Sequence, residues 1–164
     1  MVGEQLVGLR PEHYAQVIGV VDEWWGGRPM APMLPRLFFD HFGETSFAVE
    51  HDGRCVAFLT GFVSQSRPTQ GYIHFVGVNP EHRKRNMGRR LYEHFIRAMV
   101  ERGVSTVSAV TSPQNTGSLA FHLRMGFEVA PSECERGGMC VHPDYDGPGE
   151  DRVLLELHLP RAGR

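Results

Sequence analysis

The chain has 164 residues, of which 41% are hydrophobic and 22% charged, and its formal net charge is −2. These values suit one globular domain, residues 1–164, and exclude an intrinsically disordered chain. No apolar stretch reaches the roughly 18 residues of a membrane span, so we expect no membrane partner. The weak net charge disfavours a protein built mainly to bind nucleic acid, so we expect no nucleic-acid partner.

The N-terminus and the cysteines indicate the cellular setting. Residues 1–10 contain no basic segment followed by an apolar run, so they do not resemble a secretory signal and we expect a cytoplasmic protein. The cysteines are odd in number and lack CxxC spacing, which predicts free thiols at Cys55, Cys134 and Cys140. We therefore expect neither a disulfide framework nor a metal cofactor.

The N-terminal segment predicts one strand and two helices. Residues 4–9 predict a short strand, and Pro11, a residue favoured at the first helical position, opens a helix through Trp24. Gly26-Gly27 ends this helix, and a second helical segment covers about 35–42.

Three strands are predicted next. Strands at 45–50 and 54–64 flank Asp52-Gly53, a pair typical of tight hairpin turns, so we expect the two strands to pair antiparallel. A third apolar run at 72–78 ends at Asn79-Pro80, because proline cannot continue a central strand.

Residues 87–102 predict an amphipathic helix that Gly103 ends. Charged side chains cover one side of this helix. Its apolar side chains recur at helical spacing, at Met87, Leu91, Tyr92, Phe95, Ile96 and Met99.

The last third of the chain completes an alternating α/β domain. It predicts a strand at 104–111, a helix near 116–125 stopped by Gly126, a strand from Phe127, a long loop rich in glycine and proline, and a final strand at 152–159. An exposed final strand has unpaired backbone groups, so a homodimer is our expectation.

A loop of basic residues joins the strand at 72–78 to the following helix. The first N–H groups of a helix lack internal partners and carry the positive end of the helix dipole, so phosphate binds there readily. Gly88 allows a phosphate to approach the backbone, and neither a Walker loop nor a Rossmann fingerprint is present. The basic residues are Arg83, Lys84, Arg85, Arg89 and Arg90, which taken alone also suit a solvated surface.

Together with its flanking residues, this loop resembles the GNAT acetyltransferase family over nearly the whole chain. Residues 76–80 followed by 83–88 are similar to the family's strand and R-x-x-G-x-G/A pyrophosphate loop. Asn86 stands where glycine is usual, but asparagine tolerates a left-handed backbone well. Residues 115–127 are similar to the family's N-x-x-[AS]-x-x-[FL]-Y-x-x-x-G-F segment, with His122 at the tyrosine position.

The resemblance implies a fold and a cosubstrate. The fold is a central, mostly antiparallel mixed sheet of about seven strands flanked by about four helices, with strands 4 and 5 splayed apart. The cosubstrate is acetyl-CoA, with its pantetheine arm along the strand and its pyrophosphate over the basic loop. The implied cosubstrate contacts are Val76, Gly77, Val78, Arg83, Lys84, Arg85, Asn86, Met87, Gly88, Arg89, Asn115 and Ser118.

Two histidines are the candidates for proton transfer. His74 stands where many family members place a glutamate, and strand alternation puts it on one face with Tyr72, Val76 and Val78. An imidazole with a pKa of about 6.5 suits a general base, although a core histidine satisfied by backbone is an equal alternative. His122 is the candidate to donate a hydrogen bond or a proton to the CoA sulfur.

The acceptor is expected to be a small-molecule or peptide amine, bound by the parts of the chain that differ most among acetyltransferases. The candidate contacts are Trp24, Trp25, Arg28 and Tyr145, although Trp24 also suits an ordinary core position at a helix end. Asp144, Asp146, Glu150 and Asp151 suit either attraction of a cationic amine or ordinary turn chemistry.

The resemblance therefore predicts an N-acetyltransferase acting by direct attack of the amine. One alternative is a non-catalytic acyl-CoA sensor with a blocked acceptor site. The other is a small module that binds metal or nucleic acid, which the basic loop alone supports poorly because no stacking aromatics surround it.

Overall fold

The computed structural model describes residues 3–161, apart from the side chain of Lys84. Its main feature is a seven-stranded sheet in the order β1-β2-β3-β4-β5-β9-β6, in which only the β4–β5 pair is parallel. The strands are β1 (Gln5–Gly8), β2 (Phe47–His51), β3 (Arg54–Val63), β4 (Gln70–Val78), β5 (Thr106–Thr111), β6 (Glu128–Val129) and β9 (Val153–His158). The predicted mixed, mostly antiparallel α/β fold is confirmed.

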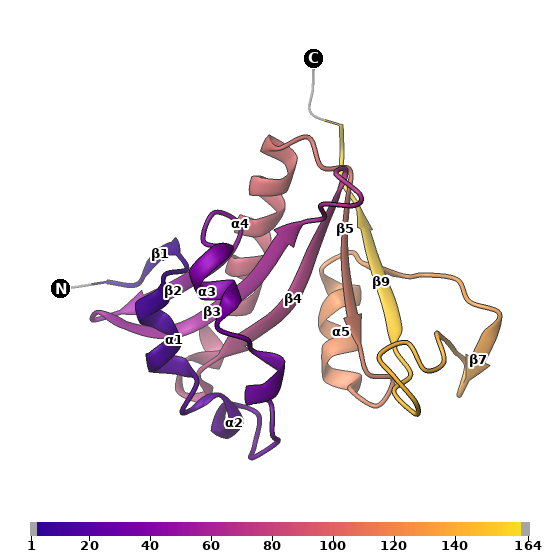
Figure 1. Ribbon diagram of the computed structural model, residues 1–164, viewed down its shortest axis with the longest axis horizontal. Helices are drawn as coiled ribbons and strands as arrows, with labels where there is room; N and C mark the ends of the chain where they lie inside the picture. The colour runs from indigo at the N-terminus through magenta and orange to yellow at the C-terminus, as the bar shows by residue number, and fades with distance from the viewer. Residues whose placement is uncertain (1–2, 162–164) are drawn as a thin grey trace.

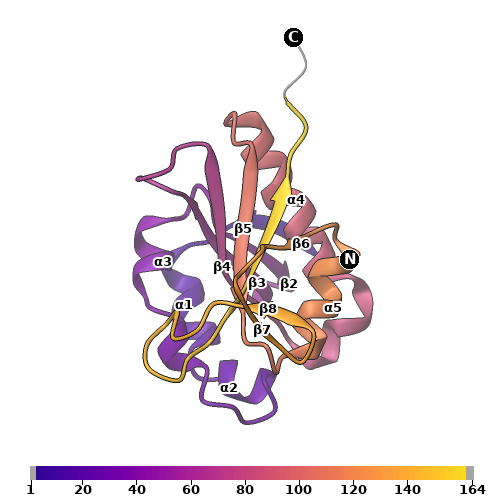
Figure 2. The same cartoon turned by 90° about the vertical axis from the view of Figure 1, so that its right-hand side faces the viewer.

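Helices cover both faces of the sheet (Figures 1 and 2). The short helices α1 (Pro11–Val17), α2 (Val21–Trp24) and α3 (Leu37–His41) lie on one face, and α4 (Met87–Glu101) and α5 (Thr116–Arg124) lie on the other. Each face has its own apolar core. Leu91, Phe95 and Met99 of α4 belong to one core, and Val17, Phe39 and Phe58 belong to the other.

Strands β4 and β5 diverge after a short parallel contact. They pair only at Gln70↔Thr106, Gly71↔Val107 and Tyr72↔Ser108, and the strands then separate into the two arms of a V (Figure 1). No strand therefore pairs with the β5-facing edge of β4 beyond Tyr72 within the described residues. The predicted splay is confirmed.

A β-bulge at His74 changes which way the side chains of β4 point. Thr60 of β3 pairs with Phe75 and Gly61 pairs with Ile73, so His74 is an extra residue in the ladder. His74 stacks on Phe38 of α3, whereas Val76 and Val78 pack against the core beneath α4. The prediction that one face carries Tyr72, His74, Val76 and Val78 is therefore wrong, because strict alternation assumes a strand without a bulge.

The predicted helix at residues 11–24 is two helices in the structure. α1 ends at Val17 and α2 begins at Val21, with a turn between them that contains Gly19. Glycine and the β-branched residues beside it are poor helix formers, so the chain breaks there. A 3₁₀ turn, η1 (Ala31–Met33), then precedes α3.

The C-terminal part of the sheet differs from the prediction in two ways. The final strand β9 lies between β5 and β6, so it is an interior strand, and β1 and β6 form the edges. The argument for a homodimer through an exposed final strand therefore fails. The loop rich in glycine contains a hairpin, β7 (Cys134–Arg136) and β8 (Met139–Val141), turned by Gly137-Gly138. That Gly-Gly pair is a hairpin signal in the sequence.

The β2–β3 turn is formed as predicted. Asp52 and Gly53 both have positive φ, 49° and 75°, as a two-residue hairpin turn of this hand requires. Among the described residues, no helix is long and apolar enough to cross a membrane.

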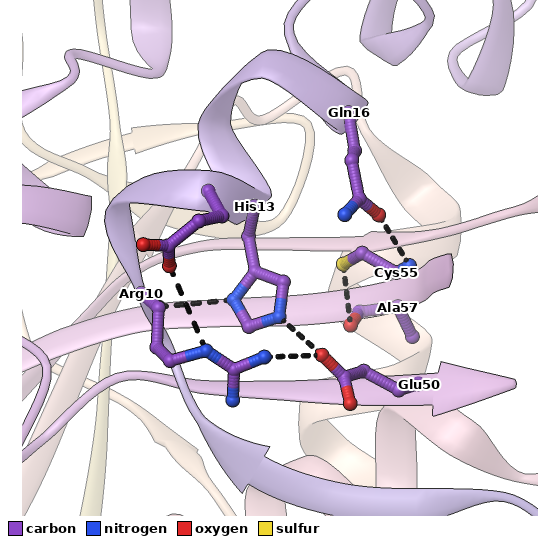
Figure 3. A network of polar contacts seen from close by, with 7 residues as sticks. Arg10, His13, Gln16, Glu50, Cys55 and Ala57 are labelled. Atoms are coloured by element: carbon purple, nitrogen blue, oxygen red, sulfur yellow. Dashed lines mark hydrogen bonds and ion pairs between the residues drawn. The ribbon is translucent and has the colours of Figure 1, made fainter. Parts of the chain in front are cut away.

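A polar network that the sequence analysis did not predict fastens α1 to the sheet (Figure 3). His13 is fully buried, and its Nδ1 accepts from the Arg10 N–H at 2.9 Å, so its Nε2 carries the proton and donates to Glu50 Oε1 at 2.8 Å. Gln16 Oε1 accepts from the Cys55 N–H at 2.8 Å. The His13 hydrogen bond holds the pKa of Glu50 below its usual range.

Candidate active site

The basic loop folds into a 3₁₀ turn followed by the N-terminus of α4, the geometry that the predicted anion cradle requires. The 3₁₀ turn η2 (Pro80–Arg85) follows β4, and Asn86 has a left-handed backbone with φ 54°, the conformation for which asparagine substitutes for glycine. In α4, the Arg90 N–H donates to the Asn86 carbonyl at 3.0 Å. The N–H groups of Met87, Gly88 and Arg89 come before this first helical bond and are available to an anion.

Gly88 lies at the open side of the cradle. A Cβ added there would meet Phe121 at 3.8 Å and Val78 at 4.0 Å, which are ordinary contacts. Gly88 therefore lies between the end of β4 and α5, directly beside the V opened by the splayed strands. A small side chain fits there, whereas a larger one would crowd Phe121 and Val78.

The arginines that were expected to contact the cosubstrate bond groups of the protein itself. Arg83 donates from Nη2 to the Trp24 carbonyl, and Arg89 pairs with Glu93 at 2.8 Å. Glu4 accepts from Arg85 at 2.8 Å and from Arg90 at 2.6 Å, and these bonds lower the pKa of its carboxyl. The cradle is therefore built mainly from backbone N–H groups, with arginines around it. The side chain of Lys84 lies outside the described residues.

His74 lies at the bulge, on the face covered by α3. Its ring is parallel to that of Phe38, with centroids 4.7 Å apart, and its Nε2 lies 2.6 Å from the Met33 carbonyl oxygen. A carbonyl can only accept, so Nε2 carries the proton and Nδ1 keeps its lone pair. Burial lowers the pKa of His74, which keeps the imidazole neutral. His74 is therefore a histidine satisfied by backbone, and the same hydrogen bond leaves on Nδ1 the lone pair that a general base needs.

His122 lies on the other face, in the core between α4 and α5. Its Nδ1 donates to the Ser118 carbonyl at 2.8 Å, so its Nε2 accepts from the Tyr92 hydroxyl at 2.8 Å. Burial lowers its pKa. The structure does not bring His74 and His122 together, and both ring nitrogens of His122 are already hydrogen-bonded. No signal in the sequence linked Tyr92 to His122.

The residues at the start of α5 organise that helix. Asn115 is its N-cap, and its side-chain oxygen accepts from the Ser118 N–H at 3.1 Å. Asn115 therefore bonds neighbouring backbone, whereas the resemblance implied a contact with the cosubstrate. Ser118 contacts His122 through its carbonyl, and its hydroxyl lies 3.3 Å from His122 Nδ1.

Two of the candidate acceptor contacts, Trp24 and Trp25, point into different surroundings. Trp24 is buried beside Phe58, as the alternative of a core residue predicted. Trp25 is half-buried and its ring lies 4.8 Å from that of Phe75. Arg28 is exposed after the glycine pair. Of the two tryptophans, only Trp25 remains in a position to meet an acceptor.

Hydrogen bonds and ion pairs with nearby protein groups stabilise the acidic loop between β8 and β9. Asp144 accepts from the Gly149 N–H at 2.7 Å, and Arg152 pairs with Asp146 at 2.7 Å and with Glu150 at 3.1 Å. Asp151 pairs with Arg136 at 2.5 Å. All four carboxylates therefore serve turn and ion-pair chemistry, the second of the two predicted alternatives. They hold Tyr145 48% exposed on the loop.

Several side chains near His74 were missed by sequence reasoning. Phe38 supplies the ring beneath His74, and Phe62 stacks on Tyr72 with centroids 5.3 Å apart. Burial, with the nearby Tyr145 and Asp146, raises the pKa of Tyr72 to about 12. The face of β4 that α3 covers is therefore aromatic around His74. Among residues 3–161, no cluster of three or more His, Cys, Asp or Glu is placed to hold a metal ion.

The comparisons with known proteins agree with this geometry. Residues 13–127 match the model of the Acetyltransferase (GNAT) family. The chain is 27% identical over 122 residues to the L-2,4-diaminobutyric acid acetyltransferase of Virgibacillus pantothenticus, covering 74% of this chain and 76% of that protein. It is 25% identical over 130 residues to the ribosomal protein bS18-alanine N-acetyltransferase of Escherichia coli K12, covering 78% and 82%.

A solved structure shows the same fold. It is the diaminobutyrate acetyltransferase EctA from Paenibacillus lautus, determined in complex with L-2,4-diaminobutyric acid and coenzyme A. The TM-score is 0.71 at 17% identity, and the superposition covers 99% of this chain and 100% of that one. At this identity the likeness supports the fold and no finer conclusion.

Proposed function

The chain belongs to the GNAT acetyltransferase family, and from that premise we propose that it transfers the acetyl group of acetyl-CoA to a primary amine. The observation that carries the proposal is the junction of two features. The splayed edge of β4 ends at a helix N-terminus whose first N–H groups are available and whose Gly88 leaves room for a phosphate.

Each part of this junction suits one part of acetyl-CoA. The unpaired edge of β4 at Val76–Val78 offers backbone groups to the amides of the pantetheine arm, as an added strand would use them. The N–H groups of Met87, Gly88 and Arg89 suit the pyrophosphate, with the surrounding arginines adding positive charge. Acetyl-CoA supplies an acetyl group activated as a thioester.

His74 is the proposed base for the amine. Its neutral imidazole has the lone pair on Nδ1, and the bond from Nε2 to the Met33 carbonyl fixes the tautomer and the ring orientation. An amine enters the cleft largely as ammonium, so a proton must leave before attack, directly or through water. The stacked Phe38 limits rotation of the ring.

His122 has a different role in this proposal from the one first expected. With both nitrogens engaged by Ser118 and Tyr92, it holds α5 against α4 and so keeps Gly88 and Phe121 at their separation. The leaving thiolate then takes its proton from a group other than His122, for which water is sufficient.

The acceptor is proposed to be a primary amine attached to an apolar group. Two named relatives acetylate amines of different size, diaminobutyric acid in one case and the alanine of a ribosomal protein in the other. Here the exposed apolar side chains of Met33, Leu37 and Tyr145 border the acceptor side, and the nearby carboxylates are neutralised by arginine. Trp25 and Arg28 are the further proposed contacts.

Thiol release measures this function directly. The purified protein is incubated with acetyl-CoA and a panel of amines that covers diamino acids, polyamines, aromatic amines and peptides with free N-termini, and free CoA is measured with a thiol reagent. We expect amine-dependent release with at least one acceptor. Binding of acetyl-CoA without release for every amine would instead indicate a sensor, and no binding would reject the proposal.

A further inference from the structure

Residues 24–34, which we call the acceptor loop, are held at both ends by side chains from the segment that runs from β4 into η2. Arg83 in η2 donates to the carbonyl of Trp24 at the start of the loop. His74 on β4 donates to the carbonyl of Met33 near its end, at 2.6 Å. Both donors come from the segment that would bind the cosubstrate, and both acceptors come from the segment that would bind the amine.

Between these two attachments the acceptor loop is ordered by its own contacts. Asp22 Oδ1 accepts from the N–H groups of Met30 and Ala31, each at 2.8 Å. Gly26 and Gly27 have φ values of 65° and 89°, a conformation that other residues rarely adopt, so the turn depends on them. The loop is therefore a compact unit, and Trp25 within it packs against Phe75 of β4.

The bond from Arg83 lies near an open pocket. This pocket, of about 810 Å³, lies among α1, α2, the β2–β3 turn and the start of η2, and its lining includes Val20, Trp24, Asp52, Asn79 and His82. Trp24 itself is buried beside Phe58. Beside the pocket, the Arg83 bond joins η2 to the last residue of α2.

We propose that Arg83 is a positioning residue that couples occupation of the acetyl-CoA cradle to the order of the acceptor loop. This inference rests on the proposed function. A guanidinium has five N–H donors, and the bond to Trp24 leaves others for a phosphate oxygen. Arg83 lies three residues before Asn86, in the turn that leads into the cradle, and its side chain is exposed.

The proposed coupling makes each of the two ligands, the cosubstrate and the amine, strengthen binding of the other. An anion that fixes the guanidinium also fixes its bond to Trp24, and the loop then holds the Met33 carbonyl against His74. The cosubstrate therefore strengthens binding of the amine, and the amine must strengthen binding of the cosubstrate by the same factor. Ordinary couplings of this kind change affinity about 5-fold to 150-fold.

Hydrogen exchange on residues 24–34 tests the coupling without a known acceptor. Wild type, Arg83→Ala, Arg83→Lys and the control Arg97→Ala, an exposed arginine of α4, are compared with and without coenzyme A. We expect coenzyme A to slow exchange in the loop at least about fivefold in wild type and in the control. At saturating coenzyme A, Arg83→Ala, which binds it more weakly because it lacks the guanidinium, is expected to lose the slowing, and Arg83→Lys, which keeps a donor, to recover part of it.

Kinetics with an active amine supply a second readout. Arg83→Ala is expected to raise the KM for the amine at least about fivefold and to change kcat much less. Unchanged loop protection in Arg83→Ala at saturating coenzyme A would overturn the coupling. Wild-type protein that binds coenzyme A without slowing the loop would overturn this inference alone, whereas absence of binding would overturn the proposed function with it.

Discussion

The proposed cosubstrate side and the proposed acceptor side of the V differ in composition. The cosubstrate side consists mainly of backbone: a strand edge, a left-handed Asn86 and the N–H groups of the first turn of α4. The acceptor side consists of side chains from distant parts of the chain, namely Phe38, His74 and Tyr145. A site made of backbone can be predicted from a short motif, whereas a site made of convergent side chains depends on the whole fold.

The largest expected effect is on the acceptor side. His74→Gln keeps a polar side chain at the bulge but removes the titrating base, and we expect kcat to fall about 100-fold to 10,000-fold. Because burial lowers the pKa of His74, the acidic limb of the wild-type kcat/KM profile should have its midpoint below about 6.5, since the base acts only when neutral.

A pH–rate profile of both proteins measures this effect. The limb should be absent in the variant, and the dissociation constant for acetyl-CoA should be similar in the two proteins. A variant that keeps wild-type kcat and the same limb would show that His74 only supports the structure.

On the cosubstrate side, Gly88→Asp should abolish the anion site while Gly88→Ala preserves it. The carboxylate of aspartate repels phosphate and fills the space beside Phe121 and Val78, whereas alanine makes only ordinary contacts. We expect Gly88→Asp to weaken acetyl-CoA binding at least about 100-fold, or about 2.7 kcal/mol, by titration calorimetry. Equal affinity in the two variants would place the cosubstrate elsewhere.

The hydrogen bonds that attach α1 to the sheet should contribute to the free energy of unfolding. Glu50→Gln replaces a carboxylate bonded to buried His13 and to Arg10, and we expect it to lower the free energy of unfolding by about 1–3 kcal/mol at neutral pH. Because the pKa of Glu50 is lowered in the folded protein, its contribution is present above the ordinary pKa of glutamate, about 4.3, and is lost as the pH falls through the folded pKa.

Urea denaturation at pH 7 and at pH 3.5 measures this loss. The gap between wild type and Glu50→Gln should narrow at the lower pH. Glu12→Gln is the control, because Glu12 is 72% exposed and 3.7 Å from Arg10. A gap that is equal at both pH values would exclude an ionised Glu50 as the source of the stability.

The smallest expected effect concerns the core beneath the cradle. Tyr92→Phe removes the hydroxyl that donates to His122 and should cost about 1 kcal/mol of stability while leaving the acetyl-CoA dissociation constant within about twofold. Thermal denaturation and calorimetry measure the two quantities. A large loss of kcat in Tyr92→Phe at unchanged stability would show that the Tyr92–His122 pair takes part in the reaction.

The sequence was sufficient for the parts of the fold and site that local patterns determine. The turn at Asp52-Gly53 and the left-handed Asn86 follow from the backbone preferences of single residues, and the helix after Met87 follows from apolar residues at helical spacing. Gly137-Gly138 is an equally local signal, typical of the turn in the β7–β8 hairpin.

The rest depends on contacts between residues far apart in the chain. The partner of Arg83 is 59 residues away and that of His74 is 41 residues away, so no local pattern identifies either. The bulge at His74 arises from the register between β3 and β4, and it turns Val76 and Val78 to the opposite face. The bond from Tyr92 to His122 likewise joins two helices whose packing the sequence pattern does not specify.

The central claim is that acetyl-CoA binds at the junction of β4 and α4, and a titration followed by the backbone amide signals of the protein in NMR tests it most directly. We predict saturable one-to-one binding, with the largest shifts at the amides of Val76–Val78 and Met87–Arg90 and smaller ones in residues 24–34. Saturable shifts that leave those amides unchanged, or no shifts at millimolar acetyl-CoA, would contradict the account.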